Sequence, residues 1–183
     1  MTRTPTAPAG PDERGMSMIE LIIAASIAAL LLGLMASLFV TGLRTEAATR
    51  DRDRATGQAQ VVTDSIQTSI RNAADINVTD DLLVARVIVG DGVSECRAWA
   101  LTPSGDLAYT ASDVPIGTDP SAWTVLAGSV SGGLDGGAAF RAGDTDSRTV
   151  EVELIVRAGD AVVPVSAAAV TVVPEDGVDE VCL

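Results

Sequence analysis

The sequence contains no histidine and no lysine, and all 12 of its basic residues are arginines. These absences exclude a Ser–His–Asp triad, a Cys–His pair, a histidine metal ligand, a phosphate-loop lysine and a Schiff-base lysine. The 25 acidic residues give a net charge of −13, whereas a nucleic-acid surface needs clustered cations. We therefore expect no enzyme activity, no catalytic residue, no cofactor, no metal and no direct contact with nucleic acid.

Aromatic residues are also scarce, at 3% of the 183 residues, but 47% of the residues are apolar. Much of this apolar content lies in residues 18–40, where Glu20 is the single charge. Residues 21–40 carry no charge, and as a helix they would cover about 30 Å, the thickness of a bilayer's hydrocarbon core. We predict that this segment spans a membrane.

The polar stretch that follows the apolar run is typical of a helix. Glu46 and Arg50 have the i,i+4 spacing that stabilises an exposed helix by about 0.2–0.5 kcal/mol. Further on, Val62, Ile66 and Ile70 recur at helical spacing between polar residues, which predicts an amphipathic stripe that packs on another element. No proline interrupts this region, so one helix from about residue 17 to 75 is expected.

Beyond residue 76 the apolar period changes from helical to alternating. In residues 149–158, apolar side chains alternate with charged ones, which predicts a half-buried strand. The other predicted strands are residues 82–90, 96–102, 107–111, 123–128, 138–142 and 166–173. Short strands without intervening helices favour an antiparallel sheet, so the predicted fold class is α+β: a long N-terminal helix packed on a small antiparallel sheet. The aromatic residues Trp99, Tyr109, Trp123 and Phe140 are expected in its core.

Two cysteines remain, Cys96 at the start of a predicted strand and Cys182 next to the C-terminal residue. They are either two buried thiols or a disulfide. We favour the disulfide, because it would hold an acidic tail that otherwise frays and because it suits an exported domain.

Glu20 is the most informative residue, since a carboxylate inside an apolar span costs about 2.5–3.5 kcal/mol. If a peptidase cuts after Gly15, Met16 becomes a new amino terminus one helical turn before Glu20. Between neighbouring chains the carboxylate of one could then meet the amine of the next. This pattern indicates assembly through the helix.

The segment RGMSMIELIIA (14–24) resembles the class III signal of type IV prepilins and pseudopilins. The resemblance implies cleavage between Gly15 and Met16, N-methylation of Met16 and a role for Glu20 in assembly. The family usually has phenylalanine where this chain has Met16. Residues 69–76, Cys96 and WTVLAGSV (123–130) are similar to minor pilins and J-type pseudopilins.

The resemblance also implies a domain organisation. We expect a cleaved leader peptide (1–15), a transmembrane or filament-core helix (16–41), an amphipathic continuation of that helix (42–76) and a pilin-like antiparallel sheet domain with a C-terminal loop (77–183). The expected partners are a prepilin peptidase and methyltransferase, other pilin or pseudopilin subunits, an assembly platform and the membrane.

We expect the chain to be a single-pass protein of the cell membrane with its C-terminal domain outside the cytoplasm. It would then become part of a cell-surface filament. The arginines favour the opposite orientation, because the flank of a span that carries more cations normally stays in the cytoplasm. Two arginines precede the span, Arg3 and Arg14, and four follow it, Arg44, Arg50, Arg52 and Arg54. The prepilin-type signal, which a peptidase reads on the cytoplasmic face, and the cysteine pair favour the exterior.

An alternative is an anchored adhesin or sensor domain that does not assemble, which leaves Glu20 without a partner. The acidic pairs Asp144 with Asp146 and Glu151 with Glu153 are expected on the solvated surface rather than in acid–base chemistry. The acidic residues Asp176, Asp179 and Glu180 lack the spacing of an EF-hand calcium loop.

Overall fold

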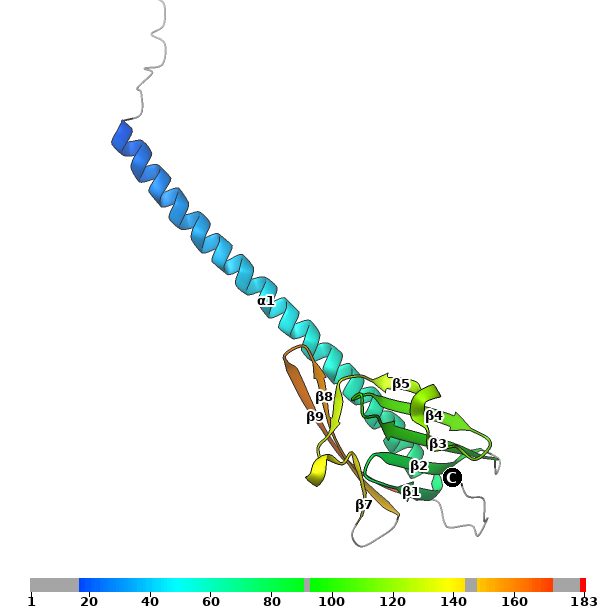
Figure 1. Cartoon of the computed structure of the whole chain (residues 1–183). Coiled ribbons are helices and arrows are strands. Elements are labelled where there is room, and N and C mark those ends of the chain that lie inside the picture. Colours follow the sequence, from blue (N-terminus) through cyan, green and yellow to red (C-terminus); the bar gives the residue numbers. More distant parts are fainter. Residues whose placement is uncertain (1–16, 91–92, 144–147, 173–181) are drawn as a thin grey trace, which may run out of the picture. The chain divides into compact units, whose positions relative to one another are not determined.

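The computed structural model describes residues 17–90, 93–143, 148–172 and 182–183. The chain divides into two units, Met1–Thr45 and Glu46–Leu183. Helix α1 (Met18–Arg71) supplies the described part of the first unit and the beginning of the second (Figure 1). The predicted fold class, α+β with a long N-terminal helix and antiparallel strands, is confirmed, but the strands form two sheets where one small sheet was predicted.

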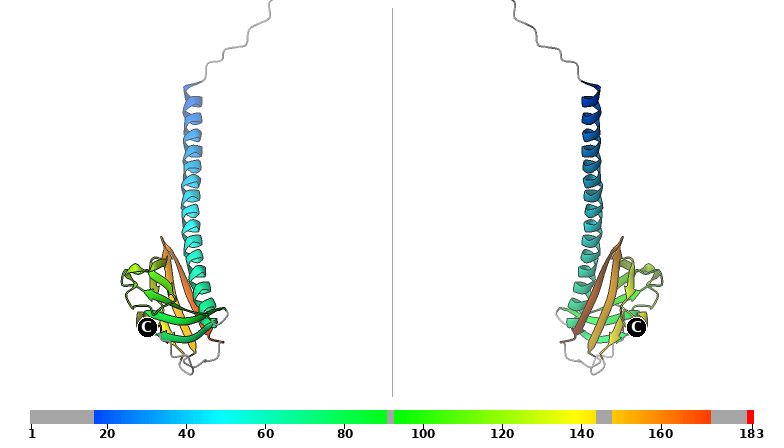
Figure 2. Two further views of the ribbon diagram at one scale, coloured as in Figure 1. Left: turned by 90° about the vertical axis from the view of Figure 1, so that its right-hand side faces the viewer. Right: turned by 90° about the vertical axis from the view of Figure 1, so that its left-hand side faces the viewer.

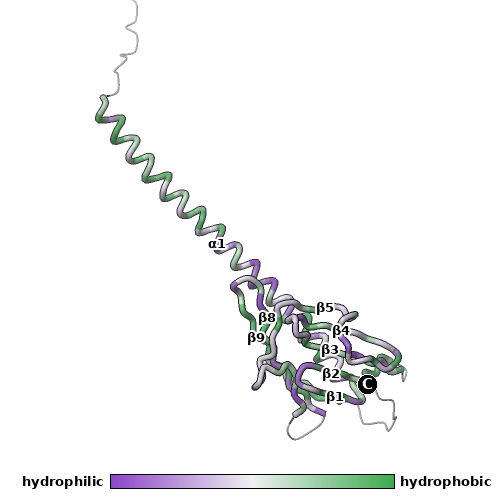
Figure 3. The backbone as a smooth tube through the Cα atoms, viewed as in Figure 1, coloured by the Kyte–Doolittle hydropathy of each residue, from purple (hydrophilic) through white to green (hydrophobic). Residues whose placement is uncertain are grey.

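In the first unit, the hydroxyl groups of Ser26, Thr41 and Thr45 donate to the carbonyl oxygen four residues earlier in α1, at 2.8, 2.9 and 3.0 Å. Each of these bonds pairs a hydroxyl hydrogen that would otherwise cost several kcal/mol in an apolar surrounding. These polar residues are thus compatible with a hydrocarbon environment. Figure 3 shows the mainly hydrophobic character of this part of the helix.

In the second unit, α1 buries a narrow stripe against the sheets: Ala55, Ala59, Val62, Ile66, Ser69 and Ile70. The stripe includes Val62, Ile66 and Ile70, the three apolar residues whose helical spacing predicted it. The prediction that the helix continues to residue 75 or 76 is wrong, because α1 ends at Arg71 and β1 (Ala73–Val78) follows at once. The N–H of Asn72 donates to the carbonyl of Ser69 at the turn, and β1 then pairs with β2. Sheet pairing therefore overrides the helical spacing of these residues.

The first sheet contains five antiparallel strands in the order β1-β2-β3-β4-β5. After β1 come β2 (Leu82–Gly90), β3 (Val93–Leu101), β4 (Leu107–Ser112) and β5 (Thr124–Ala127). The boundaries of β2 agree with the prediction, and those of β3, β4 and β5 differ from it by a few residues. A loop with the 3-10 turn η1 (Pro120–Ala122) connects β4 to β5.

The second sheet has β8 at its centre. It contains β6 (Val130–Gly132), β7 (Phe140–Ala142), β8 (Thr149–Ala158) and β9 (Ala161–Val170), and the 3-10 turn η2 (Asp135–Gly137) lies between β6 and β7. Strands β6 and β7 pair with β8 along one side, and β9 pairs with it along the other. The predicted strand at 166–173 is wrong in its start, because β9 begins at Ala161 and includes Pro164.

One main core joins the C-terminal part of α1 to both sheets (Figure 2). Its largest fully buried side chains include Trp99, Phe140 and Ile66. Tyr109 packs against this core while partly exposed, and Trp123 packs against a smaller cluster on the outer face of the first sheet. Of the four predicted core aromatics, two are thus fully buried and two lie at the edge of a cluster.

Candidate functional site

The first unit presents an apolar helical surface. Every residue from 17 to 45 is exposed. The large apolar side chains among them are Met18, Ile19, Leu21, Ile22, Ile23, Ile27, Leu30, Leu31, Leu32, Leu34, Met35, Leu38, Phe39, Val40 and Leu43. In the described part of the chain, α1 is the one helix long and apolar enough to cross a membrane. A continuous apolar surface of this extent marks a site of contact with lipid or protein.

Glu20 lies in the first turn of α1, within this apolar surface. The N–H of Leu21 donates to the carbonyl of Ser17 at 3.1 Å, so helical bonding is already established around Glu20. A carboxylate in the first turn is stabilised by the positive end of the helix dipole. Among the described residues, no cation pairs with it. The other two predicted processing residues, Gly15 and Met16, lie outside the described residues.

Two serines of α1 fix the helix to β3 by hydrogen bonds. The indole Nε1–H of Trp99 donates to the Ser65 hydroxyl at 3.1 Å, and the Arg97 guanidinium donates to the Ser69 hydroxyl at 3.1 Å. Arg97 also forms a salt bridge with Glu95, at 2.8 Å. These contacts set the position of β3 along the helix in the second unit.

Tyr109 lies beside Trp99 on the same face of the first sheet. The two residues are paired across β3 and β4, and their ring centroids are 5.4 Å apart at an interplanar angle of 43°. Burial raises the pKa of the Tyr109 hydroxyl, the nearby positive charge of Arg97 opposes this rise, and Glu95 adds to it. The phenol is therefore neutral at physiological pH and acts as a packing group.

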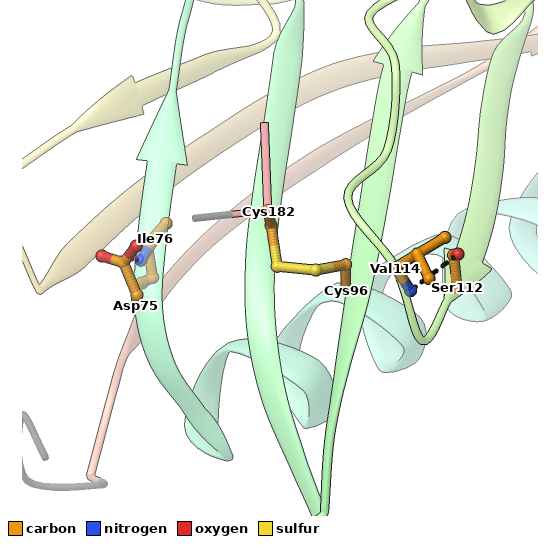
Figure 4. The surroundings of a disulfide bond; sticks show 6 residues. All are labelled: Asp75, Ile76, Cys96, Ser112, Val114 and Cys182. Carbon is orange, nitrogen blue, oxygen red and sulfur yellow. Dashed lines mark hydrogen bonds between the residues drawn. A yellow bond between two sulfur atoms is a disulfide. The ribbon is translucent and has the colours of Figure 1, made fainter. Parts of the chain in front are cut away.

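A disulfide joins Cys96 in β3 to Cys182 near the end of the chain, with 5.6 Å between the Cα atoms (Figure 4). The structure thus contains the pairing that the sequence favoured. Both cysteines are nearly buried, with 9% and 6% of their surfaces exposed, in a cluster with Val84, Ala98 and Ile116. The N–H of Ile116 donates to the carbonyl of Cys182 at 2.9 Å. The end of the chain is therefore held by one covalent bond and one backbone hydrogen bond.

Acidic side chains form no recognisable ion site in the described residues. No group of three or more His, Cys, Asp or Glu residues there could hold a metal ion. Glu151 is exposed and Glu153 is half-buried on β8. The fully exposed Asp119 accepts a bond from the N–H of Ser121, which lowers the pKa of its carboxyl. Asp144, Asp146, Asp176, Asp179 and Glu180 lie outside the described residues.

Comparison with known proteins gives no relative. A scan against models of protein families, a search of curated proteins and a search of solved structures each found no match to this chain. The described residues combine three features: an exposed apolar helix, a carboxylate in its first turn, and a sheet domain whose C-terminal end is held by a disulfide.

Sequence reasoning missed the polar contacts between α1 and β3. Ser65 and Ser69 look like ordinary polar positions of an amphipathic helix, and both contact the sheet. One signal was available, because Ser65, Ser69 and the buried Ile66 and Ile70 are spaced so that they lie on adjoining parts of one helix surface. The partners Trp99 and Arg97 follow only from the register of β3.

Proposed function

We propose that this chain is a non-enzymatic structural subunit, a minor pilin or pseudopilin, of a filament related to type IV pili or to type II secretion. The apolar first half of α1 would lie in the membrane before assembly and in the filament core afterwards. The sheet domain, with its C-terminal disulfide, would face the exterior. The partners in this proposal are a prepilin peptidase and methyltransferase, an assembly platform and sibling subunits.

One observation carries the proposal: Glu20 lies in the first turn of an exposed apolar helix, and no cation pairs with it among the described residues. In a lone membrane span this carboxylate costs about 2.5–3.5 kcal/mol and has no counter-charge to pair with. In an assembly it can pair with the amino terminus of a neighbouring subunit, cut between Gly15 and Met16. The bare anchor of an adhesin or sensor offers no such partner.

The mature amino terminus tests this proposal against the anchor. We would express the full chain with a prepilin peptidase and determine the intact mass and N-terminal peptide by mass spectrometry. A chain that begins at methylated Met16 is expected, and a chain that keeps Met1 would overturn the proposal. Replacing Gly15 with leucine should leave the precursor uncut in the membrane. The matched control Gly10→Leu changes a leader glycine outside the motif and should be processed normally.

A further inference from the structure

The chain has two asparagines, and only one of them has a hydroxyl residue at the second position after it. Thr79 stands two residues after Asn77, with Val78 between them, whereas Ala74 stands two residues after Asn72. The pattern Asn-x-Ser/Thr, with any residue except proline in the middle, marks acceptors of N-linked glycans on surface segments of exported proteins. Asn77 therefore has the local sequence of a modification site, and Asn72 provides a control within the same chain.

Three polar side chains of different chemistry alternate at the end of β1. They are the carboxylate of Asp75, the carboxamide of Asn77 and the hydroxyl of Thr79. Alternate residues of a strand point to the same face of the sheet. Asn77 pairs in register with Val84, whose side chain belongs to the smaller cluster on the outer face of the first sheet. Asp75 and Asn77 therefore lie on this outer face, and Thr79 follows them into the turn.

Asn77 presents its carboxamide to solvent. The residue is exposed, and no hydrogen bond of its side chain is present in the part of the chain that the structure describes. Asn72 is exposed too, but its Nδ2–H donates to the carbonyl of Thr68 at 2.8 Å. Thr79 is also exposed, and its hydroxyl makes a long bond of 3.3 Å to the carbonyl of Leu82. The acceptor nitrogen and the hydroxyl of the pattern are thus both on the surface.

The surroundings of Asn77 leave room for a sugar. Strand β1 is the outermost strand of the first sheet, and β2 is the one strand that pairs with it among the described residues. Beside Asn77, the N–H of Ile76 donates to the carboxylate of Asp75 at 2.9 Å, so this polar group of the sheet margin is bonded within β1 itself (Figure 4). A glycan on the exposed Asn77 would extend into solvent and displace no buried side chain.

We propose that Asn77 is a site of N-linked glycosylation, an inference that rests on the exported sheet domain of the proposed function and goes beyond it. The co-substrate is an oligosaccharide linked to a polyprenyl diphosphate, and the partner is a membrane-bound oligosaccharyltransferase. Nδ2 of Asn77 forms a bond to the anomeric carbon of the first sugar and releases one proton to solvent. The bond from that carbon to the diphosphate oxygen breaks, and its electron pair leaves with the lipid diphosphate. Nothing is oxidised or reduced.

The backbone of Asn77 indicates when the transfer takes place. The N–H of Thr79 donates to the carbonyl of Leu82 at 2.8 Å, and these two residues continue the register of β1 and β2. Asn77, two residues earlier, therefore directs its own N–H and carbonyl toward Val84. A transferase has to hold the acceptor segment away from the sheet. The glycan is therefore attached to the exported chain before β1 pairs with β2, and the test has to supply the transferase while the chain folds.

Co-expression in bacteria tests this inference. The full chain is produced together with a prepilin peptidase, a bacterial oligosaccharyltransferase and a polyprenyl-diphosphate oligosaccharide of known mass. We expect the intact mass of the wild type to rise by one oligosaccharide, and the modified peptide to contain Asn77. Asn77→Gln keeps a carboxamide and should remove the added mass, as should Thr79→Ala. Thr79→Ser retains a hydroxyl and should keep the modification, and Asn72→Gln should be modified as the wild type is.

Two further readouts separate this inference from the proposed function. A flexible acceptor peptide added after Leu183 reports whether the domain leaves the cytoplasm, and the N-terminal peptide of the same sample reports cleavage before Met16. A modified tag with an unmodified Asn77, or unchanged modification of Thr79→Ala, would overturn the glycosylation site alone. If neither the tag nor Asn77 is modified, the domain stays in the cytoplasm and both proposals are overturned. A glycan on Asn77 of a chain that keeps Met1 would support the site and overturn only the pilin proposal.

Discussion

The indole nitrogen of Trp99, a fully buried residue of β3, donates a hydrogen bond to the hydroxyl of Ser65, 34 residues earlier in α1. This bond lets a large aromatic side chain enter the core without an unpaired N–H. It also fixes the position of β3 along the helix, together with the contact between Arg97 and Ser69.

Removing the acceptor should destabilise the second unit. Ser65→Ala leaves the Trp99 N–H buried without a partner, so we expect the free energy of unfolding to fall by about 1–3 kcal/mol. Trp99→Phe removes donor and some apolar volume together. If the hydrogen bond matters, the double variant should lose less than the sum of the single losses. Denaturant unfolding of the four proteins in detergent measures this coupling, and strict additivity would contradict the role given to Ser65.

Replacing each of two glycines with alanine should change the stability of the protein in opposite directions. A Cβ at Gly132 in β6 would collide with the backbone of Gly137 and Ala138, which cannot move aside without shifting η2. We expect Gly132→Ala to destabilise the protein by about 1–3 kcal/mol. Gly57 in α1 has no atom within 4 Å of such a Cβ, so Gly57→Ala should stabilise it by about 1 kcal/mol. Thermal unfolding of both variants provides the comparison, and equal shifts of both midpoints would show that the collision is not the cause.

The disulfide should contribute much of the stability of the sheet domain. Cys96 and Cys182 are 86 residues apart in sequence. In the chain-entropy model, closing a loop of this length stabilises the folded state by about 4–5 kcal/mol. Replacing both cysteines with alanine should lower the free energy of unfolding by a similar amount, measured with denaturant. As a control, a reducing agent should destabilise the wild type and leave the double variant unchanged.

Stability should fall at high pH because of Tyr109. Burial raises the pKa of this hydroxyl in the folded state above its ordinary value of 10.0, so the unfolded state loses the proton first. The stabilisation that this pKa shift provides is complete below the pKa of Tyr109 in the unfolded chain. It is lost as the pH rises through the pKa of Tyr109 in the folded chain. Tyr109 is the sole tyrosine of the chain, so tyrosinate absorbance reports it directly. Arg97→Gln removes the opposing positive charge and should raise this pKa further, whereas a fall would contradict the assigned cause.

Glu20 should affect assembly and not membrane insertion. Glu20→Ala removes a carboxylate that costs about 2.5–3.5 kcal/mol in a span, so insertion should be retained or improved while incorporation into filaments falls. Membrane fractionation and immunoblots of sheared filaments measure the two effects. Glu46→Ala, which removes the exposed partner of Arg50, is the matched control and should assemble normally. Normal incorporation of Glu20→Ala would refute the role of this residue.

Elements with a strong local pattern could be predicted from sequence, and elements decided by pairing could not. The alternation in residues 149–158 predicts β8 with its observed boundaries. In contrast, Ala73 and Ala74 continue the helical spacing of α1 and still belong to β1, because β2 offers partners for their backbone groups. The first half of β9 could not be predicted, because it contains Pro164. A proline is tolerated in a strand only where its missing N–H faces away from the partner strand, and a sequence does not reveal which side of a strand lacks a partner.

In the candidate site, too, some features are visible in the sequence and others depend on how the chain folds. Glu20 and its apolar surroundings are visible in the sequence, because a single charge in a long apolar run needs no tertiary information to be noticed. The sequence could favour a link between Cys96 and Cys182, but their spacing alone does not establish one. The contacts of Ser65 and Ser69 depend on the register of β3 against α1, which only the folded chain defines.

The bond between Cys96 and Cys182 also decides how the domain responds to mechanical load. A force applied to Leu183 passes through one peptide bond and the disulfide directly into β3. The residues between the two cysteines, which include β4 to β9, are bypassed and cannot be extended by that pull. Traction on the tail is thereby delivered to the strand that Trp99 and Arg97 tether to the helix.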